Sequence, residues 1–241
     1  MQTMFMSVPS GYRTVNLPDP DCEVLPGVRW GRFDALLTAA YWKGQADQAE
    51  AFGMRQRLRL GSDLLEETAA CLLGGYGMRG ELGVLAFRRL RDIGILNRCA
   101  PAEEIEANLA EPFVMKNGSN VRYRFPRQKA RYLESMLLAL RTFEEPEEDV
   151  LLRDALTAIP GVGLKTASWV VRNHRASDSV AVLDVHIVRA CEHLGVFPAR
   201  SDPQKSYREL EESFLNFASA IDVPASLLDA VMWRHMRLIA G

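Results

Sequence analysis

A tight turn followed by a lysine is the part of the sequence whose residue types and spacing best suit chemistry. The turn is Pro160-Gly161-Val162-Gly163, and apolar residues at helical spacing begin directly after it at Leu164. Two glycines two positions apart allow a backbone to approach another group closely. The amide groups of the turn, with the amino end of the following helix, would offer donors and a partial positive charge to an anion such as a phosphate. The same residues also fit a plain turn between two helices.

Two ionisable residues beyond this turn are candidates for a chemical role. Lys165 lies in the first turn of the expected helix, and Asp184 follows 19 residues later. An unprotonated amine is a nucleophile, and a carboxylate stabilises positive charge that develops near it. On the residue pattern alone, Lys165 also fits a surface lysine, and Asp184 also fits the N-cap of a helix that begins at Val185.

A run of basic residues precedes the turn. Between Lys116 and Tyr132 the chain has six basic residues and no acidic one, with aromatic residues among them. The basic residues are Lys116, Arg122, Arg124, Arg127, Lys129 and Arg131. This pattern is typical of a surface that contacts nucleic acid, although a solvated surface explains it as well. Acidic residues at 144–149 follow, and we expect a solvated link there with Asp149 as an N-cap.

The overall composition is that of an ordinary globular protein. The 241 residues are 48% hydrophobic and 25% charged, and 29 basic against 31 acidic side chains give a net charge of −2. Net charge therefore gives no reason to expect a polyanion or a membrane surface as partner, and a nucleic-acid site has to be a local patch.

The cysteines give no sign of a metal centre. Cys22, Cys71, Cys99 and Cys191 stand far apart, without the close pairs of a zinc or iron-sulfur loop. The chain also lacks an export signal and an apolar stretch of about 18 residues. We therefore expect an intracellular protein, in the cytoplasm or nucleoid.

The spacing of apolar residues predicts an all-α fold. A segment rich in proline, glycine and aspartate runs to about Val28, and we expect residues 1–28 to form an extended arm and 29–241 a helical domain. Apolar residues three and four apart predict helices from Trp30 to about residue 41, and over 64–73, 82–90, 102–109, 129–140 and 150–158. Strand-type alternation is nearly absent.

The segments IPGVGLKTASWVV and VAVLDVHIVRA together resemble the helix-hairpin-helix and aspartate signature of the DNA base-excision glycosylase superfamily. Lys165 stands where the bifunctional glycosylase/lyase branches of that superfamily carry a lysine, and its spacing to Asp184 is similar to that of 8-oxoguanine glycosylases. RYRFPRQKARYLESML and LLDAVMWRHM resemble the compact archaeal-type branch. The chain lacks the four-cysteine loop of the endonuclease III branch.

This resemblance covers about residues 122–197 and extends more weakly to 236, whereas the first hundred residues show nothing comparable. It implies two helical subdomains with the active site in the cleft between them. It also assigns Lys165 as the nucleophile that attacks the anomeric carbon and forms a Schiff base, and Asp184 as the carboxylate that stabilises the developing charge.

Four further residues are site candidates, the first two by their position and Asp229 and Trp233 by the resemblance, and each has a plainer alternative. His186 either contacts a DNA phosphate or completes the helix cap. Trp169, four residues after Lys165 on the same helix face, either walls off an extruded base or packs in the core. Asp229 and Trp233 either recognise the base or dock the last helix on the core.

Two asparagines are candidates for the group that fills the space left by a flipped nucleotide. Asn117 and Asn120 lie in a turn-forming loop at the start of the basic run, and we expect one of them to read the opposite base. Asparagine and glycine are also common in ordinary turns.

The expected function is therefore that of a DNA glycosylase/AP lyase of base excision repair, acting on 8-oxoguanine in double-stranded DNA. Two alternatives stay open: the same chemistry on another modified or oxidised base, and a helix-hairpin-helix module that binds DNA without chemistry and needs neither Lys165 nor Asp184. We expect a monomer that requires no cofactor and no metal centre, with room for a monovalent cation at the hairpin.

Overall fold

The computed structural model describes residues 1–55, 58–75, 77–98 and 100–239. Cys99 therefore lies outside the described residues, and the thiols of Cys22, Cys71 and Cys191 are free. The chain forms two compact units. The first combines Met1–Leu58 with Ala176–Gly241, and the second is the intervening segment Arg59–Arg175.

The first unit is built mainly from helices α1, α8, α9 and α10. Its elements are β1 (Gln2–Val8), β2 (Gly11–Leu17), β3 (Glu23–Leu25), β4 (Val28–Arg29), α1 (Ala39–Ala51), α8 (Val185–Leu194), α9 (Pro203–Ala220) and α10 (Ala225–Ile239). Helix α10 packs against α1, α8 and α9. Trp42, Phe214, Phe217 and Leu228 are fully buried, and they form the centre of this unit.

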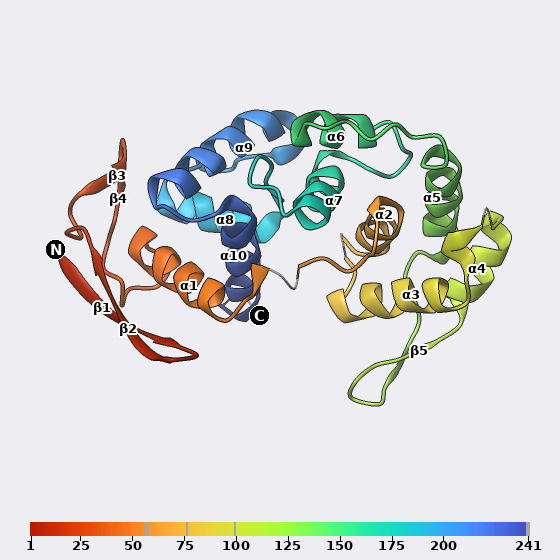
Figure 1. Cartoon of the computed structure of the whole chain (residues 1–241), viewed down its shortest axis with the longest axis horizontal. Helices are drawn as coiled ribbons and strands as arrows, with labels where there is room; N and C mark the ends of the chain where they lie inside the picture. The colour runs from red at the N-terminus through yellow and green to blue at the C-terminus, as the bar shows by residue number, and fades with distance from the viewer. Residues whose placement is uncertain (56–57, 76, 99, 240–241) are drawn as a thin grey trace. The chain divides into compact units, whose positions relative to one another are not determined.

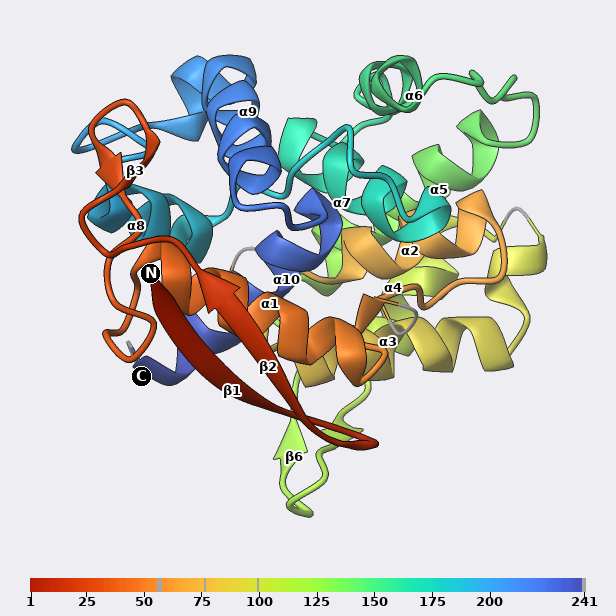
Figure 2. The same cartoon turned by 60° about the vertical axis from the view of Figure 1, so that its left-hand side comes forward.

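The expected N-terminal arm contains an antiparallel hairpin of strands β1 and β2. Met4 and Met6 are buried while Phe5 between them is exposed, which is the alternation of a strand with one covered face. The hairpin lies along α1 (Figure 2), and the thioether of Met4 rests against Gly44. The missing side chain of that glycine leaves the space in which the methionine lies.

Helix α1 begins later than the sequence indicates, so the helix predicted from Trp30 was wrong over residues 30–38. Leu37 has a φ of +64°, which interrupts a right-handed helix. Thr38 then caps α1, because its hydroxyl accepts a hydrogen bond of 3.0 Å from the amide of Tyr41. The predicted helical face of Phe33 and Leu36 instead belongs to a series of turns.

The second unit contains the helices that the apolar spacing predicted, and Figure 1 shows their order. Its elements are α2 (Leu64–Leu73), α3 (Gly80–Asp92), the 3-10 turn η2 (Ile95–Asn97), α4 (Ala102–Ala110), β5 (Phe113–Val114), β6 (Asn120–Val121), α5 (Pro126–Ala139), α6 (Asp149–Leu156) and α7 (Leu164–Arg175). Helix α2 is central, because it packs against α3, α5 and α7. Helix α6 packs against α7.

The acidic segment before α6 is bound by an arginine, so the prediction of a solvated link was incomplete. Arg175 at the end of α7 pairs with Glu145 at 2.6 Å and with Asp149 at 3.2 Å. It also donates to the carbonyl oxygen of Glu147 at 2.5 Å. The prediction of Asp149 as N-cap was wrong, because Glu148 holds the cap position and the Asp149 carboxylate faces Arg175 instead.

Among the described residues, no single helix is long and apolar enough to cross a membrane. Helices α9 and α10 reach that length and composition only as a pair, and the chain bends by 100° between them. The same residues contain no group of three or more histidine, cysteine, aspartate or glutamate side chains placed to hold a metal ion.

Candidate active site

The predicted turn between two helices is present in the second unit. Helix α6 ends at Leu156, and the amide of Val162 donates to the carbonyl oxygen of Ile159 at 3.0 Å. Val162 is buried, whereas Gly161 and Gly163 on either side are exposed. The turn is thus anchored by one apolar side chain and presents its two glycines outward.

Backbone conformation and packing require a glycine at position 161 of the turn but not at position 163. Gly161 has a φ of +86°, and a Cβ atom built there would lie 2.4 Å from Cδ2 of Tyr132 on α5. A larger residue at this position would meet both backbone strain and the aromatic ring. At Gly163 a Cβ atom would have nothing within 4 Å. The sequence predicted that the backbone of this turn approaches another group closely. At Gly161 that group is the ring of Tyr132 in the same unit.

Lys165 is the second residue of α7 and is half-buried. Among the described residues its amine has no hydrogen-bond partner and no acidic side chain within ion-pair distance. Trp169 follows one turn later, and its indole ring packs against Gly74, where a Cβ atom would lie 2.8 Å from the ring. Trp169 is thus packed on one edge at the end of α2 and half-exposed on the other.

Lys129 differs from the other basic residues of its run, because its ammonium group is bound inside the unit. It donates to the carbonyl oxygens of Leu72 and, at 3.4 Å, of Gly74, both at the end of α2. Burial lowers the pKa of Lys129, and the positive charge of Lys165 lowers this pKa further. The sequence predicted that Lys129 contacts DNA. The apolar periodicity of α5 gave no sign that its ammonium group binds the end of α2 instead.

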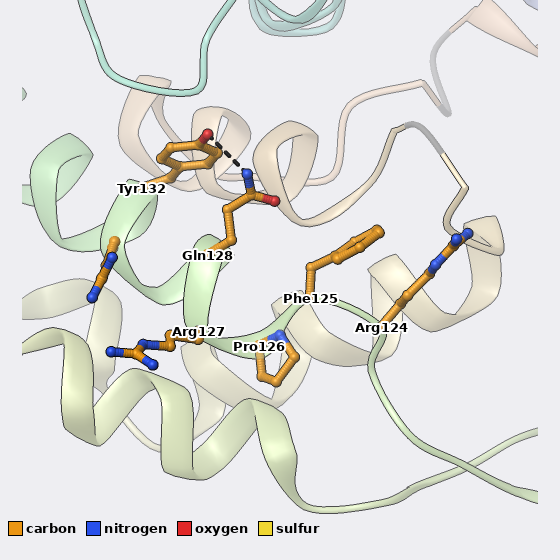
Figure 3. Close-up of a pocket in the computed structure, with 7 residues that line it drawn as sticks. Arg124, Phe125, Pro126, Arg127, Gln128 and Tyr132 are labelled. Carbon is orange, nitrogen blue, oxygen red and sulfur yellow. Dashed lines mark hydrogen bonds between the residues drawn. The ribbon is translucent and has the colours of Figure 1, made fainter.

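The other basic residues of the run are exposed at the start of α5. Arg124, Arg127 and Arg131 line a surface depression of about 560 Å³ together with Phe125 and Tyr132. The Arg124 guanidinium lies 4.9 Å from the centre of the Phe125 ring, and Gln128 donates to the Tyr132 hydroxyl at 3.1 Å (Figure 3). The depression thus combines positive charge with aromatic surface, and none of the described residues that line it is acidic.

Arg122 and the two candidate asparagines lie just before α5. Arg122 is exposed. Asn117 and Asn120 belong to the narrow β5–β6 hairpin, visible in Figures 1 and 2. The Asn117 side-chain oxygen accepts from the Ser119 amide at 3.1 Å and from its hydroxyl at 2.7 Å, so this side chain shapes the turn. Asn120 is exposed in β6, opposite Val114.

Asp184, in the first unit, is the N-cap of α8. One carboxylate oxygen accepts from the amides of His186 and Ile187 at 2.8 and 3.1 Å. The predicted cap is confirmed. The second oxygen accepts no hydrogen bond among the described residues, so it is available to another group. The ring nitrogen Nδ1 of His186 is buried and has no partner within the same described set.

The segment before Asp184 is held by three buried polar side chains, of which only Asp229 was a predicted site residue. The Ala181 amide donates to Glu211 at 2.9 Å, and the Tyr207 hydroxyl donates to the Ala181 carbonyl at 2.7 Å. The Val182 amide donates to Asp229 at 3.1 Å. Asp229, a predicted base-pocket residue, thus holds the backbone of the segment that leads to Asp184. The sequence shows no comparable sign that Glu211 and Tyr207 do the same, because a glutamate and a tyrosine are ordinary residues in a helix.

Trp233 lies one turn after Asp229 on α10, and 39% of its surface is exposed. The guanidinium of Arg237 stacks over its ring at 4.5 Å from the ring centre. An exposed indole on a helix whose other face is buried is suited to contact a planar group.

Comparison with known proteins identifies the family. A family model described as 8-oxoguanine DNA glycosylase matches residues 47–223, more than half of the chain. The chain belongs to the 8-oxoguanine DNA glycosylase family. The resemblance inferred from the hairpin and aspartate motifs is therefore confirmed, and the strands β1–β4 lie outside the matched residues.

Individual relatives agree with this family. An 8-oxoguanine DNA glycosylase/AP lyase of Metallosphaera sedula is 33% identical over 153 residues, which cover 61% of this chain and 71% of that protein. The 8-oxoguanine DNA glycosylase of Thermotoga maritima has a similar structure, with a TM-score of 0.63, 21% identity and coverage of 82% and 94%. The Methanocaldococcus jannaschii 8-oxoguanine glycosylase/lyase, solved in complex with a 15mer DNA containing 8-oxoguanine, gives a TM-score of 0.62, 23% identity and coverage of 83% and 96%.

These structural matches establish that the chain has the helical fold of the 8-oxoguanine DNA glycosylase family. The predicted all-α class is confirmed for the bulk of the chain, with the small hairpins as additions.

Proposed function

We propose that this chain is a bifunctional DNA glycosylase/AP lyase that removes 8-oxoguanine from double-stranded DNA and then cleaves the strand. The observation that carries the proposal is the environment of Lys165. It is an amine in the first turn of the helix that follows the hairpin, half-buried and without an acidic partner among the described residues. An amine of this kind is suited to covalent attack rather than to a structural ion pair. The family and its glycosylase/AP lyase relatives supply the reaction.

The first step is base removal. The Lys165 nitrogen bonds to the anomeric carbon C1′ and loses its proton, while the bond from that carbon to the base nitrogen breaks. The base leaves with the electron pair and gains a proton. Positive charge develops on the sugar during this step, and the uncommitted carboxylate oxygen of Asp184 stabilises it. The other oxygen of Asp184 keeps the carboxylate oriented through the cap of α8.

The second step is strand cleavage. Opening of the sugar ring gives a protonated Schiff base between Lys165 and C1′, which acidifies the hydrogen on the neighbouring carbon C2′. Loss of that proton breaks the bond between C3′ and its oxygen, and the 3′ phosphate leaves as an anion. Water then hydrolyses the imine and releases the lysine.

DNA binding is assigned to the hairpin and to the exposed basic residues. The backbone of the exposed Gly161 and Gly163 and the amino end of α7 are suited to a phosphate, whereas the Val162 amide, also predicted for this role, is engaged by the Ile159 carbonyl oxygen. The same function is proposed for His186, whose half-buried side chain lies in the first turn of α8. Exposed guanidinium groups extend this surface: Arg122, Arg124 and Arg127. The salt dependence of binding should then reflect a few phosphates only.

The recognition of the bases remains part of the proposal. Trp169 and Trp233 each present part of an indole ring that an extruded base would contact, and Asp229 holds the backbone of the segment that leads to Asp184. Asn120, which is exposed, is a better candidate than Asn117 for the space left by the flipped nucleotide, because the Asn117 oxygen is engaged by Ser119.

A monovalent cation at the hairpin is also part of the proposal. Monovalent cations bind carbonyl oxygens, which the 160–162 loop provides. A cation bound there would link the loop to a phosphate. The proposal further includes a monomer acting inside the cell, in the cytoplasm or nucleoid. Replacing potassium by tetramethylammonium at constant ionic strength should weaken duplex binding, and size-exclusion chromatography measures the oligomeric state.

The decisive experiment uses duplexes that each carry one lesion, with 8-oxoguanine among several oxidised bases. The wild-type protein should remove 8-oxoguanine, nick the strand without alkali, and become covalently attached to DNA when borohydride reduces the Schiff base. Lys165→Gln should abolish both the adduct and the nick. Lys205→Gln serves as a control, because that lysine is exposed on α9. An adduct that persists in Lys165→Gln would refute the assignment, and preference for another lesion would change the substrate.

A further inference from the structure

We propose that Tyr207 and Glu211, two buried side chains of α9, are positioning residues for base removal. They hold the backbone segment that leads to Asp184, and through it they set the direction of the Asp184 carboxylate. The inference rests on the proposed function, in which that carboxylate stabilises positive charge on the sugar. Both side chains act through Asp184 and contact neither the substrate nor the reacting atoms.

The segment at 180–183 needs outside support, because it belongs to no helix or strand among the described residues. Val180, Ala181 and Leu183 are buried, so most of this segment is shielded from water. Buried backbone amides have to be paired, and helices and strands pair theirs through a ladder that this segment lacks. Side chains of other elements therefore have to supply the acceptors.

Two side chains of α9 supply most of these partners. The Ala181 amide donates to the Glu211 carboxylate at 2.9 Å. The Tyr207 hydroxyl donates to the Ala181 carbonyl oxygen at 2.7 Å, and it accepts from the Leu183 amide at 3.4 Å. One hydroxyl group therefore holds two successive peptide groups of the segment in a fixed relation.

The burial of the two side chains makes this arrangement rigid. Tyr207 is 6% exposed and Glu211 is 5% exposed, and they lie one turn apart on the same face of α9. Hydrogen bonds are stronger in a low-dielectric interior than in water, and a buried group that loses its partner is costly. Asp229 of α10 adds a third acceptor, because the Val182 amide donates to it at 3.1 Å. The amides of residues 181–183 are thus all bound by side chains from two helices of the same unit.

The held segment ends directly at Asp184. The Asp184 amide donates to the Val182 carbonyl oxygen at 3.0 Å, so this residue is tied to the segment before it. On the other side, one oxygen of its carboxylate caps α8. The direction of the second oxygen therefore depends on both attachments. Displacement of a reacting group by about 1 Å can lower a rate by about 10²-fold, so the accuracy of this attachment affects the reaction.

The proposed reaction gives this positioning role a specific signature. The Asp184 carboxylate acts in base removal, whereas strand cleavage proceeds through the Schiff base of Lys165. A duplex with a preformed abasic site therefore bypasses the step in which the carboxylate acts. Loss of either positioning side chain should slow excision of the base and leave the nicking of an abasic duplex unchanged. A general loss of folded structure would lower both rates.

The experiment measures single-turnover excision from an 8-oxoguanine duplex and nicking of an abasic duplex, at enzyme concentrations that saturate both. Tyr207→Phe and Glu211→Ala should slow excision by roughly 10- to 10²-fold, the range for a displacement of up to about 1 Å. Their nicking rates and their affinities for the duplex should equal those of wild type. Glu211→Gln keeps an oxygen that accepts from the Ala181 amide, so it should excise faster than Glu211→Ala.

Tyr123→Phe is the matched control, because it also removes a buried hydroxyl that donates to a carbonyl oxygen, in this case that of Leu73 in the second unit. It should leave the ratio of excision to nicking unchanged. The Asp184→Asn background tests whether Tyr207 acts through the carboxylate. There Tyr207→Phe should slow excision no further, because the group that it positions is already absent. An additive loss in the double variant would overturn the inference.

A second readout does not depend on catalysis. Amide hydrogen exchange, followed by NMR, should be faster at Leu183 in Tyr207→Phe than in wild type, while the amides of α8 exchange at unchanged rates. Unchanged exchange at Leu183, an unchanged excision rate, or equal slowing of excision and nicking would each overturn the inference. A wild-type protein that neither excises the base nor nicks the abasic duplex would instead overturn the proposed function, and the exchange comparison would still show whether Tyr207 holds the segment.

Discussion

Gly161→Ala should destabilise the protein far more than Gly163→Ala, although the two glycines belong to the same turn. At Gly161 the backbone has a φ of +86°, and an added Cβ atom would lie 2.4 Å from Cδ2 and 2.5 Å from Cγ of Tyr132. These ring atoms lie next to the Cβ atom of Tyr132, so the contact is relieved only by a change in its χ1 rotamer or by a shift of α5. At Gly163 an added Cβ atom meets nothing within 4 Å.

The size of the effect follows from two contributions. A residue with a Cβ atom in the left-handed region costs about 1–2 kcal/mol. Forcing a methyl group into packed side chains costs a further contribution of about 1–3 kcal/mol. The sum of about 2–5 kcal/mol corresponds to a decrease in melting temperature of roughly 4–20 °C for a chain of this size. Gly163→Ala should change the free energy of unfolding by less than about 1 kcal/mol, in the stabilising direction.

Thermal unfolding followed by circular dichroism measures both variants, and Tyr132→Ala separates the two contributions. In the Tyr132→Ala background the steric part disappears, so Gly161→Ala should cost only about 1–2 kcal/mol there. Equal losses for the two glycines, or an undiminished loss in the Tyr132→Ala background, would refute the assigned contact. Gly163→Ala also offers a folded variant in which duplex affinity can be measured at the exposed position of the turn.

Three further predictions concern single side chains. Asp184→Asn should retain the cap of α8 and the melting temperature, because asparagine is a good N-cap. The variant should nevertheless slow base excision by a factor on the order of 10²–10³. An unchanged single-turnover rate would contradict the role of the carboxylate. Burial and the charge of Arg234 lower the pKa of His235 below its ordinary 6.5, so the unfolded chain takes up the proton first and stability should fall as the pH drops below about 6.5. His235→Gln should flatten that dependence in melting curves between pH 7 and 5, whereas the exposed His193→Gln should not. Tyr123→Phe should cost about 1–2 kcal/mol in urea unfolding, because the buried hydroxyl donates to the Leu73 carbonyl; an unchanged midpoint would mean that the bond contributes nothing.

Most helices were predictable from the sequence because their burial follows the helical period. The helix predicted from periodicity over residues 30–38 was wrong because Leu37 adopts a left-handed backbone conformation. A leucine side chain gives no sign of such a conformation. It also failed at the N-terminal hairpin, where proline and glycine at the turn hid the alternation of Met4 and Met6. The strand pattern there is short, and a two-residue repeat of methionines is a weak signal.

The local structure around the candidate site was predictable where neighbouring residues determine it. The turn at 160–163 and the cap at Asp184 are set by residues adjacent in the chain, so their sequence is sufficient. The end of α2 is different, because Lys129 reaches it from more than fifty residues away. Contacts of that kind depend on how helices pack, and a basic residue within a basic run gives no indication that it points inward.

The contact between Met4 and Gly44 makes the effect of one substitution depend on the presence of another segment. Glycine inside a helix costs about 1 kcal/mol relative to alanine. With the β1–β2 hairpin in place, alanine at position 44 has to displace the Met4 thioether, because its Cβ atom would lie 2.6 Å from that sulfur, so much of the gain is lost. In a chain that lacks residues 1–17 the same substitution should be favourable. The effect of a substitution at position 44 therefore depends on whether the hairpin is present.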